Sequence, residues 1–288
     1  MFVSGKTKVY AVIGDPIEHS LSPAMQNAAF EASKLDCVFL AFKVKSAEVG
    51  DAMSGMRALD IQGLNVTMPH KNAVISFLDE VDKTATCLKA VNTIKNKNGK
   101  LYGFNTDGVG ALTALRENGV APKGKKVVLL GAGGAARAVA FALAKEADEF
   151  SILNRTLNSA AQLASLLKQE FNANVIAYTL SSLAVKANLA DADLLINATS
   201  VGMKTNAKQT LVAPGWLKPD LAVMDIVYDP IETKLAKDAK AAGARVVSGV
   251  EMLIYQGAAS FEIWTGCSAP VEVMRKAALT QLQKVQKS

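Results

Sequence analysis

Three short segments in the first part of the chain carry polar side chains beside the ends of expected strands. They are His19 to Pro23, Asn65 to Lys71 and Gly103 to Gly108. An α/β sheet binds its ligands in the crevice outside the carboxyl ends of its strands. The hydroxyls, amides, lysine and carboxylate of these segments could therefore hold a polar small molecule there and move a proton on it.

Each segment also has an ordinary structural interpretation when it is taken alone. Ser22 with Pro23 could begin a helix, Lys71 could be a surface charge, and Asp107 could be a helix N-cap. A lysine in the first turn of a helix opposes the helix dipole, which makes the surface interpretation of Lys71 less favourable. The segments indicate a site only as a set.

A glycine-rich turn follows the apolar run Val127 to Leu130. The residues Gly131, Ala132, Gly133, Gly134, Ala135 and Ala136 fit the spacing G-x-G-x-x-[G/A]. Gly131 permits a sharp turn, Gly133 lets backbone amides approach a pyrophosphate, and the small Ala136 lets helix and strand pack closely. Because a helix N-terminus also attracts anions, this order of strand, turn and helix predicts a dinucleotide site.

The end of the following strand indicates which dinucleotide binds. An NAD site usually has an acidic residue about 20 residues after the turn, where it binds the ribose hydroxyls. This chain has Asn154-Arg155-Thr156 in that place and no carboxylate. The guanidinium of Arg155 offers a planar fork for a 2′-phosphate, which favours NADP, with NAD as the weaker possibility. A loop arginine in solvent is the alternative.

The elements that position these residues alternate between strand and helix. In the N-terminal part we predict strands at 9–14, 38–44 and 64–68, helices at 23–34, 46–59 and 71–78, and a hairpin of 91–94 with 101–104. Ser46 would cap its helix, with Glu48 near the positive helix end. Such alternation predicts parallel β-α-β units.

A second alternation starts after the breaker cluster Ala121-Pro122-Lys123-Gly124. We predict strands at 127–130, 150–153, 174–178, 194–197, 222–227 and 245–247, and helices at 108–118, 135–145, 159–171, 252–264 and 271–284. The fold class is therefore α/β, with two α/β domains joined near residues 105–122. The second would be a Rossmann-type doubly wound parallel sheet, with an interdomain active-site cleft.

The composition is that of a compact globular protein, with 50% hydrophobic and 20% charged residues. The net charge of +6 could attract an anionic small molecule, but the short basic runs resemble solvated loops, so we expect no nucleic-acid partner. The scattered Cys37, Cys87 and Cys267 argue against disulfides and a zinc site. No signal peptide or membrane span is recognisable, which predicts a cytoplasmic protein without a membrane partner.

Taken together, the motifs resemble those of the shikimate dehydrogenases from about Gly14 to Gly257, nearly the whole chain. The matching segments are S-x-S-P at Ser20 to Pro23, N-V-T-x-P-x-K at Asn65 to Lys71, A-V-N-T at Ala90 to Thr93, N-T-D-G at Asn105 to Gly108, the glycine turn, N-R-T at Asn154 to Thr156, N-A-T-S-x-G-M at Asn197 to Met203, and G-x-x-M-L-x-x-Q at Gly249 to Gln256. So many motifs in one order rarely coincide by chance.

The resemblance implies a role for each matching position. Lys71 and Asp107 would be the catalytic pair beside the reacting carbonyl. The residues that bind substrate would be Ser20, Ser22, Thr67, Asn92, Asp107, Tyr228 and Gln256. The residues that bind cofactor would be Gly131, Ala132, Gly133, Gly134, Ala135, Asn154, Arg155, Thr156, Thr199, Met203, Val227 and Gly249. The two serines would hold the substrate carboxylate, and no metal is needed.

The resemblance also implies an activity and a domain arrangement. The reaction would be the reversible, NADPH-dependent reduction of 3-dehydroshikimate to shikimate, within aromatic amino acid (chorismate) biosynthesis. Because Gln256 would contact substrate, the tail would fold back onto the first domain. We therefore predict a substrate-binding domain of residues 1–107 plus 250–288 and an NADP-binding domain of residues 108–249, in a monomer or homodimer.

The residue types fit this chemistry. Hydride addition develops negative charge on the ketone oxygen, which a lysine ammonium can stabilise and protonate. In the reverse direction a neutral lysine would accept the proton of the alcohol. The charge of Asp107 would raise the pKa of a neighbouring lysine, so we expect Asp107 to orient Lys71 and the substrate rather than to act as the sole base.

One departure from the family pattern concerns the cofactor. Many NADP-using members have another basic residue three positions after the N-R-T threonine, where this chain has Ser159. A quinate/shikimate dehydrogenase that accepts NAD is therefore an alternative. A non-catalytic dinucleotide-binding regulator is another, although Lys71 and Asp107 are both present, and a methyltransferase would leave the polar segments of the first domain unexplained.

Overall fold

The computed structural model describes the backbone of residues 3–287 and the side chains of residues 3–284. The chain forms two compact units. The first consists of the described residues up to Thr106 together with those from Ile254 onward, and the second is Asp107–Leu253. The sequence predicts domain boundaries after Asp107 and Gly249. In the structure the two compact units meet after Thr106 and after Leu253.

The first unit is built on a mixed sheet with the strand order β2-β1-β3-β5-β6-β4. Its strands are β1 (Lys8–Gly14), β2 (Cys37–Lys43), β3 (Gly63–Val66), β4 (Glu80–Val81), β5 (Thr93–Lys97) and β6 (Lys100–Phe104). β1 pairs in parallel with β2 and β3, as the β-α-β pattern predicts. The predicted hairpin is confirmed as β5 and β6, and it makes β5 antiparallel to β3.

The helices of the first unit depart from the prediction at three places, one of which is a short helix at 83–88 that was not predicted. They are α1 (Ser22–Ala32), the 3₁₀ turns η1 (Ser46–Glu48) and η2 (Ala73–Phe77), α2 (Val49–Ala58), α3 (Lys83–Leu88), α9 (Gly249–Thr265), which starts in the second unit, and α10 (Val271–Lys287). Ser46 as the N-cap of one long helix is wrong, because the Glu48 carboxylate reaches back to the Lys45 backbone N–H at 3.2 Å and closes a separate turn. The helix predicted at 71–78 is the 3₁₀ turn η2.

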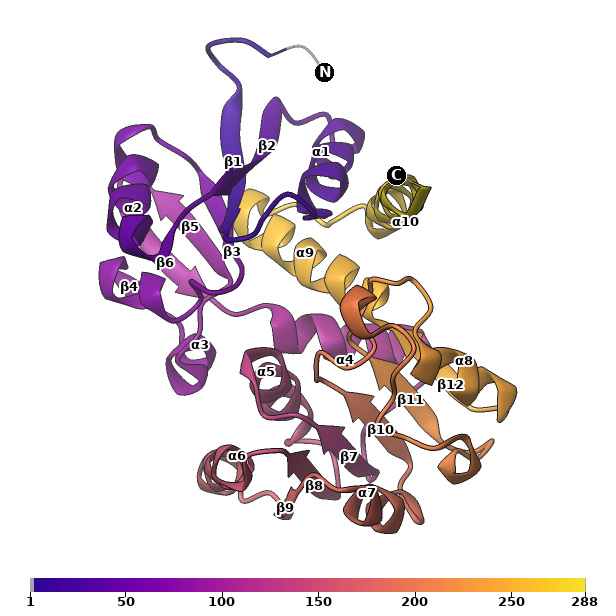
Figure 1. The fold of residues 1–288 in the computed structure, drawn as a ribbon. Helices are drawn as coiled ribbons and strands as arrows, with labels where there is room; N and C mark the ends of the chain where they lie inside the picture. Colours follow the sequence, from indigo (N-terminus) through magenta and orange to yellow (C-terminus); the bar gives the residue numbers. More distant parts are fainter. Residues whose placement is uncertain (1–2, 288) are drawn as a thin grey trace. The chain divides into compact units, whose positions relative to one another are not determined.

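Both faces of the first sheet are covered (Figure 1). Ala11, Ile13, Leu64 and Val66 pack with residues of α2 and η2 in one core cluster. Tyr10 points to the opposite face, because successive side chains of a strand alternate. There its ring packs in a tilted arrangement against Phe30 of α1 at a centroid distance of 5.0 Å and against Trp264 of α9 at 5.4 Å.

The second unit is a fully parallel sheet with the strand order β12-β11-β10-β7-β8-β9. Its strands are β7 (Lys126–Leu130), β8 (Glu149–Asn154), β9 (Val175–Thr179), β10 (Leu194–Asn197), β11 (Ala222–Asp225) and β12 (Arg245–Ser248). The strand order reverses between β7 and β10, the place where doubly wound folds bind dinucleotides. The predicted Rossmann-type sheet is confirmed.

Helices lie on both faces of the second sheet (Figure 1). They are α4 (Asp107–Glu117), α5 (Gly134–Leu143), α6 (Leu157–Phe171), α7 (Ser182–Leu189) and α8 (Lys234–Ala241), with 3₁₀ turns η3 (Lys204–Asn206) and η4 (Pro214–Trp216). α7 and α8, which the sequence analysis missed, share a core with Val128 and Leu195. Within the described part of the chain, no helix is long and apolar enough to cross a membrane.

Candidate functional site

One edge of the first sheet collects the polar segments of the first unit. β1, β3 and β6 end at this edge, and the antiparallel β5 begins there, since Thr93 is the register partner of both Asn65 and Phe104. Thr67 therefore follows β3, Asn92 precedes β5 and Asn105 follows β6 at the same edge. Segments that lie far apart in the sequence become neighbours through this topology.

Asn92 is the centre of this edge and is only 2% exposed. Its Oδ1 accepts hydrogen bonds from the Thr106 backbone N–H at 2.8 Å and the Thr93 hydroxyl at 2.9 Å. Its Nδ2 donates to Thr106 Oγ1 at 2.9 Å and to Gln256 Oε1 at 3.4 Å. Asn92 and Gln256, both predicted to bind substrate, are thus brought together with a fixed amide orientation.

Behind Asn92 lies a buried set of neutral polar groups that the sequence analysis did not identify. Asn65 Nδ2 donates to Ser260 Oγ at 3.1 Å and to Thr93 Oγ1 at 3.3 Å, and the hydroxyls of Thr93 and Ser260 are 2.8 Å apart. Ser260 lies one helical turn after Gln256, so its hydroxyl donates to the Gln256 carbonyl at 3.0 Å. The i, i+4 spacing was the available sequence signal.

The backbone around Lys71 is held from several sides. The Thr67 N–H donates to the Ile13 carbonyl at 3.0 Å, and the Val91 N–H donates to the Lys71 carbonyl at 2.8 Å. The ring of the buried His70 bonds to the Val44 carbonyl through Nε2 at 2.6 Å. The Lys71 side chain is half-buried. These contacts fix the backbone position from which the Lys71 side chain extends.

The remaining predicted substrate positions of the first unit are at the start of α1. Ser22 is buried, and its backbone N–H donates to the Ser20 hydroxyl at 3.3 Å. The helix N-cap is Leu21, and no side-chain hydrogen bond caps it. A capping role for Ser22 is therefore not observed. Lys71 belongs to the first unit, whereas the buried Asp107 is the first residue of α4 and of the second unit.

In the second unit the glycine turn joins β7 to α5. Gly131 has φ +108°, and a Cβ there would lie 2.8 Å from the Ala198 carbonyl oxygen. Gly133 is the N-cap of α5 without a side-chain cap, and a Cβ on Gly133 or on Gly134 would meet no atom within 4 Å. Open space over uncapped backbone amides is what a bound pyrophosphate needs, so these residues fit a dinucleotide.

The residues predicted to take the phosphate end of the cofactor follow β8. Asn154 ends the strand, and its Nδ2 donates to the Thr156 carbonyl at 3.0 Å, which closes the bend. Arg155 lies at the tip of this bend, is exposed, and has no ion-pair partner among residues 3–284. The bend fixes the backbone at Arg155, and the exposed guanidinium is open to an anion at the same edge as the glycine turn.

The loops after β10 and β11 carry the other predicted cofactor positions. Thr199 is half-buried, Met203 is exposed, and Val227 is buried. Tyr228 follows Val227, and its burial, with the neighbouring charge of Asp229, raises its pKa. Gly249 begins α9, where a side chain would overlap the Ile226 carbonyl. These positions all follow the carboxyl ends of β10, β11 and β12.

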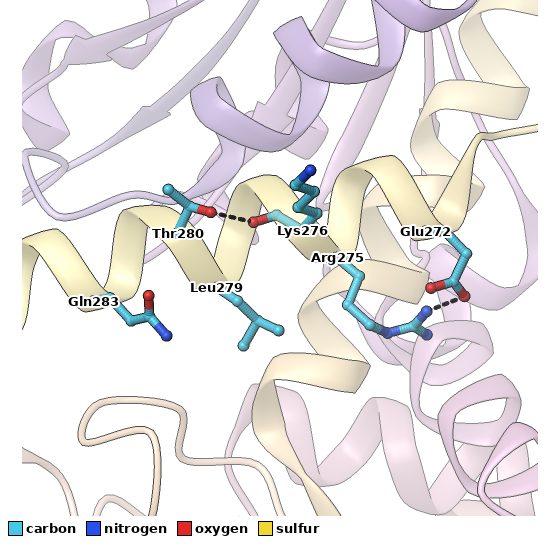
Figure 2. A pocket seen from close by; sticks show the side chains of 6 residues that line it. All are labelled: Glu272, Arg275, Lys276, Leu279, Thr280 and Gln283. Carbon is cyan, nitrogen blue, oxygen red and sulfur yellow. Dashed lines mark hydrogen bonds and ion pairs between the residues drawn. The ribbon is translucent and has the colours of Figure 1, made fainter.

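A separate surface hollow of about 300 Å³ runs along α10. Figure 2 shows its lining side chains Glu272, Arg275, Lys276, Leu279, Thr280 and Gln283. Glu272 pairs with Arg275, and Thr280 donates to the Lys276 carbonyl at 2.8 Å. None of the predicted site residues lines it, and we assign it no role.

Family models match most of the chain. The shikimate dehydrogenase substrate-binding domain matches residues 12–94, the shikimate/quinate 5-dehydrogenase model residues 114–227, and the shikimate 5′-dehydrogenase C-terminal domain residues 249–279. The first falls on the polar edge of the first unit, and the second contains the glycine turn.

Whole-chain comparisons agree with the family models. The "Shikimate dehydrogenase (NADP(+))" of Methanopyrus kandleri is 51% identical over 98% of both chains. A shikimate dehydrogenase crystallised with NADP+ superimposes with a TM-score of 0.91, at 43% identity and 98% coverage of both chains. The shikimate 5-dehydrogenase of Listeria monocytogenes, crystallised with shikimate and NAD, also gives a TM-score of 0.91, at 36% identity and 96% and 98% coverage. The chain therefore belongs to the shikimate dehydrogenase family.

Proposed function

We propose that this protein is an NADP-dependent shikimate dehydrogenase, which reversibly reduces 3-dehydroshikimate to shikimate in aromatic amino acid biosynthesis. The observation that carries the proposal is the pairing of two features in one chain. The first unit gathers Lys71, Asn92 and Gln256 at one sheet edge, and the second unit has an open glycine turn followed by Arg155. Such a pair suits a polar ring substrate and a phosphorylated dinucleotide.

The first unit would bind the substrate. We assign the carboxylate to the hydroxyls of Ser20 and Ser22, and the ring hydroxyls to Thr67, Asn92 and Gln256. The Oδ1 of Asn92 already accepts three hydrogen bonds within the first unit. Its orientation is therefore set before a ligand arrives, which lowers the entropy lost on binding. Tyr228 and Asp107 would reach the same substrate from the second unit.

The second unit would bind NADP(H). Residues 131–135 would hold the pyrophosphate, and Asn154, Arg155 and Thr156 the adenosine phosphate end. Thr199, Met203, Val227 and Gly249 would line the nicotinamide. When bound, the cofactor supplies the hydride, and the protein orients the two reactants.

Lys71 would act on the substrate oxygen. Its ammonium can stabilise the negative charge that grows on the ketone oxygen and then donate a proton to it. In the oxidation of shikimate the neutral amine would accept that proton. Asp107 would orient both the lysine and a substrate hydroxyl, since its carboxylate can accept a hydrogen bond from each.

The test is an absorbance assay for reduced nicotinamide with purified protein, shikimate or quinate, and NADP or NAD. We expect fast oxidation of shikimate with NADP and little with quinate. Comparable rates with quinate and NAD would favour the broader quinate/shikimate alternative, which Ser159 in place of a second basic residue keeps open. Inactivity with every pair would favour a non-catalytic dinucleotide-binding regulator.

We further propose that the enzyme is cytoplasmic and a monomer or homodimer. Light scattering on the purified chain, whose monomer mass is 30.4 kDa, distinguishes the two states. A larger assembly would contradict this part of the proposal.

A further inference from the structure

Two strands of the second sheet end on buried polar residues. Asn197 closes β10 and Asp225 closes β11, and the two are register partners. They are 3% and 1% exposed. Asp225 is not among the positions that the family motifs assigned, and no lysine or arginine among the described residues shifts the pKa of its carboxyl group. A buried carboxylate without a cation partner requires another explanation.

The Asp225 carboxylate accepts hydrogen bonds on both oxygens. Oδ1 accepts from Asn197 Nδ2 at 2.9 Å and from the Val227 backbone N–H at 3.2 Å. Oδ2 accepts from the Thr233 hydroxyl at 2.6 Å. Burial raises the pKa of Asp225, and the three hydrogen bonds oppose that rise. The carboxylate is thus a junction of three separate chain segments.

Asn197 extends the junction into the loop after β10. Its Oδ1 accepts from the Thr199 hydroxyl at 2.7 Å and from the Thr199 backbone N–H at 3.2 Å. Its Nδ2 also donates to the Val201 carbonyl at 3.2 Å. The Val201 backbone N–H in turn donates to Thr199 Oγ1 at 3.1 Å. The first turn of this loop is therefore folded around the Asn197 amide, which Asp225 orients.

Both loops that meet Asp225 pack against glycines of the proposed cofactor site. A side chain at Gly131 would collide with the Ala198 carbonyl, and one at Gly249 would overlap the Ile226 carbonyl. Ala198 follows Asn197 and Ile226 follows Asp225. A shift of either loop would therefore change the surface beside the glycine turn or at the start of α9.

We propose that Asp225 is a positioning residue for the cofactor site, which acts on the Thr199 loop through Asn197 and directly on the Val227 loop. The inference rests on the proposed function, because that function assigns Thr199 and Val227 to the cofactor. The third hydrogen bond serves a different purpose: Thr233 caps α8, where its Oγ1 accepts from the Ala236 N–H at 3.1 Å. The Oδ1 side of Asp225 orders the cofactor loops, and the Oδ2 side anchors a helix.

This division yields a matched set of variants. Asp225→Ala removes all three hydrogen bonds. Asp225→Asn can keep its amide oxygen towards Asn197 and Val227, and so retains the loop contacts. Thr233→Val removes only the hydroxyl on the helix side. Asp238→Asn, which breaks a half-buried ion pair with Lys234 on α8, is the control.

The measurements are the NADPH dissociation constant by calorimetry, the KM for shikimate, and the melting temperature. For Asp225→Ala we expect the NADPH dissociation constant to rise roughly tenfold to hundredfold, as for loss of a hydrogen bond to a charged group. The KM for shikimate should stay within about twofold, because its proposed ligands are mainly in the first unit. Asp225→Asn and Thr233→Val should lower the melting temperature but leave the dissociation constant within about threefold.

A purely structural role predicts a different pattern. Thr233→Val and Asp225→Ala would then weaken NADPH binding in proportion to their loss of melting temperature, and that outcome would overturn the inference. If Asp225→Ala does not fold, Asn197→Ala removes the same link from its other side, and unchanged NADPH affinity in that variant would equally overturn it. Wild-type protein that binds no NADPH would instead contradict the proposed function itself.

Discussion

The two polar edges of this protein are constructed in different ways. The edge of the first unit is made of side chains, in which Thr93 links Asn92 to Asn65 and Ser260 in a buried network. The edge of the second unit presents backbone at the glycine turn and the exposed Arg155, and the buried Asp225 carboxylate joins the loops after β10 and β11. The first edge is preformed by side-chain hydrogen bonds. The second is open because glycines there have no side chains.

This difference fits the two proposed ligands. A small ring with several hydroxyls must be distinguished from close analogues, and preoriented amides provide that discrimination because a wrong partner leaves them unpaired. A pyrophosphate needs close approach and many N–H donors, which glycines and a helix N-terminus supply. Changes at one edge should therefore alter one kinetic constant and spare the other.

Lys71→Met should give the largest difference between the effect on catalysis and the effect on cofactor binding. We expect kcat to fall roughly 10²- to 10⁴-fold, as for loss of a general acid or base. The NADPH dissociation constant should not change, because Lys71 belongs to the first unit. Lys89→Met, at an exposed position of the same unit, is the control. A variant with normal kcat would remove Lys71 from the proposed chemistry.

Arg155→Ala should act on the other edge alone. We expect the KM for NADP to rise roughly tenfold to hundredfold, since hydrogen bonds to charged groups contribute about 1.5–3 kcal/mol. The KM for NAD should change little, because NAD has no 2′-phosphate. Arg116→Ala, whose exposed side chain pairs with Glu146, is the matched control. Equal effects on both cofactors would exclude Arg155 from phosphate recognition.

Gly133→Ala and Gly131→Ala separate the binding of cofactor from folding. A methyl group at position 133 meets no protein atom within 4 Å, so the melting temperature should be unchanged. The KM for NADP should still rise about tenfold, because the methyl group displaces the pyrophosphate. Gly131→Ala should lower the melting temperature, since its φ of +108° and the Ala198 carbonyl both oppose a side chain. A normal KM in Gly133→Ala would place the pyrophosphate elsewhere.

Ser260→Ala tests the network of the first edge. Loss of the hydroxyl leaves Asn65 Nδ2 with one fewer acceptor, and we expect the free energy of unfolding to fall by about 1–3 kcal/mol. The KM for shikimate should rise modestly and that for NADP should not. Chemical denaturation with Ser54→Ala, an exposed serine of α2, as control gives the comparison. Unchanged stability would mean that water replaces the hydroxyl.

The sequence predicted the second edge better than the first. A glycine turn between a strand and a helix is a local signal, and Gly131 to Ala135 lie in the predicted place. The network of the first edge joins Asn65 to Ser260 across 195 positions, which no local pattern can indicate. Only the family resemblance suggested that the tail returns to the first domain.

Short elements and caps were the other weak point of the sequence analysis. α7 and α8 have eight residues each, about two helical turns, so their periodicity is barely expressed. Their starts are marked by Ser181 and Thr233, whose hydroxyls accept from Ala184 and Ala236. The Thr233 hydroxyl also donates to the Asp225 carboxylate, so the N-cap of α8 and the buried junction at Asp225 share one residue.

The smallest effect should come from the opposite edge of the second sheet. Asp193 precedes β10, and its carboxylate accepts from the Lys126 backbone N–H at 2.9 Å and from Lys125 Nζ at 3.1 Å. The backbone hydrogen bond, with help from Lys125, holds the pKa of Asp193 below its ordinary value. A lowered pKa means that this contribution to stability is present above the ordinary range near pH 4 and is lost as the pH falls through the folded value.

Asp193→Asn should therefore reduce the free energy of unfolding at pH 7 by no more than about 1 kcal/mol, because more than a third of the side chain is exposed to screening solvent. The difference from wild type should shrink as the pH falls below about 4 and disappear below the lowered pKa of folded Asp193, where both side chains are neutral. Denaturant unfolding at several pH values measures this difference in stability.

The KM values for shikimate and NADP should both be unchanged, because Asp193 lies at the amino ends of the strands. A difference in stability that persisted at low pH would show that the charge of Asp193 is not the source of its contribution to stability. An altered KM for NADP would mean that cofactor binding is not confined to the carboxyl ends of the strands.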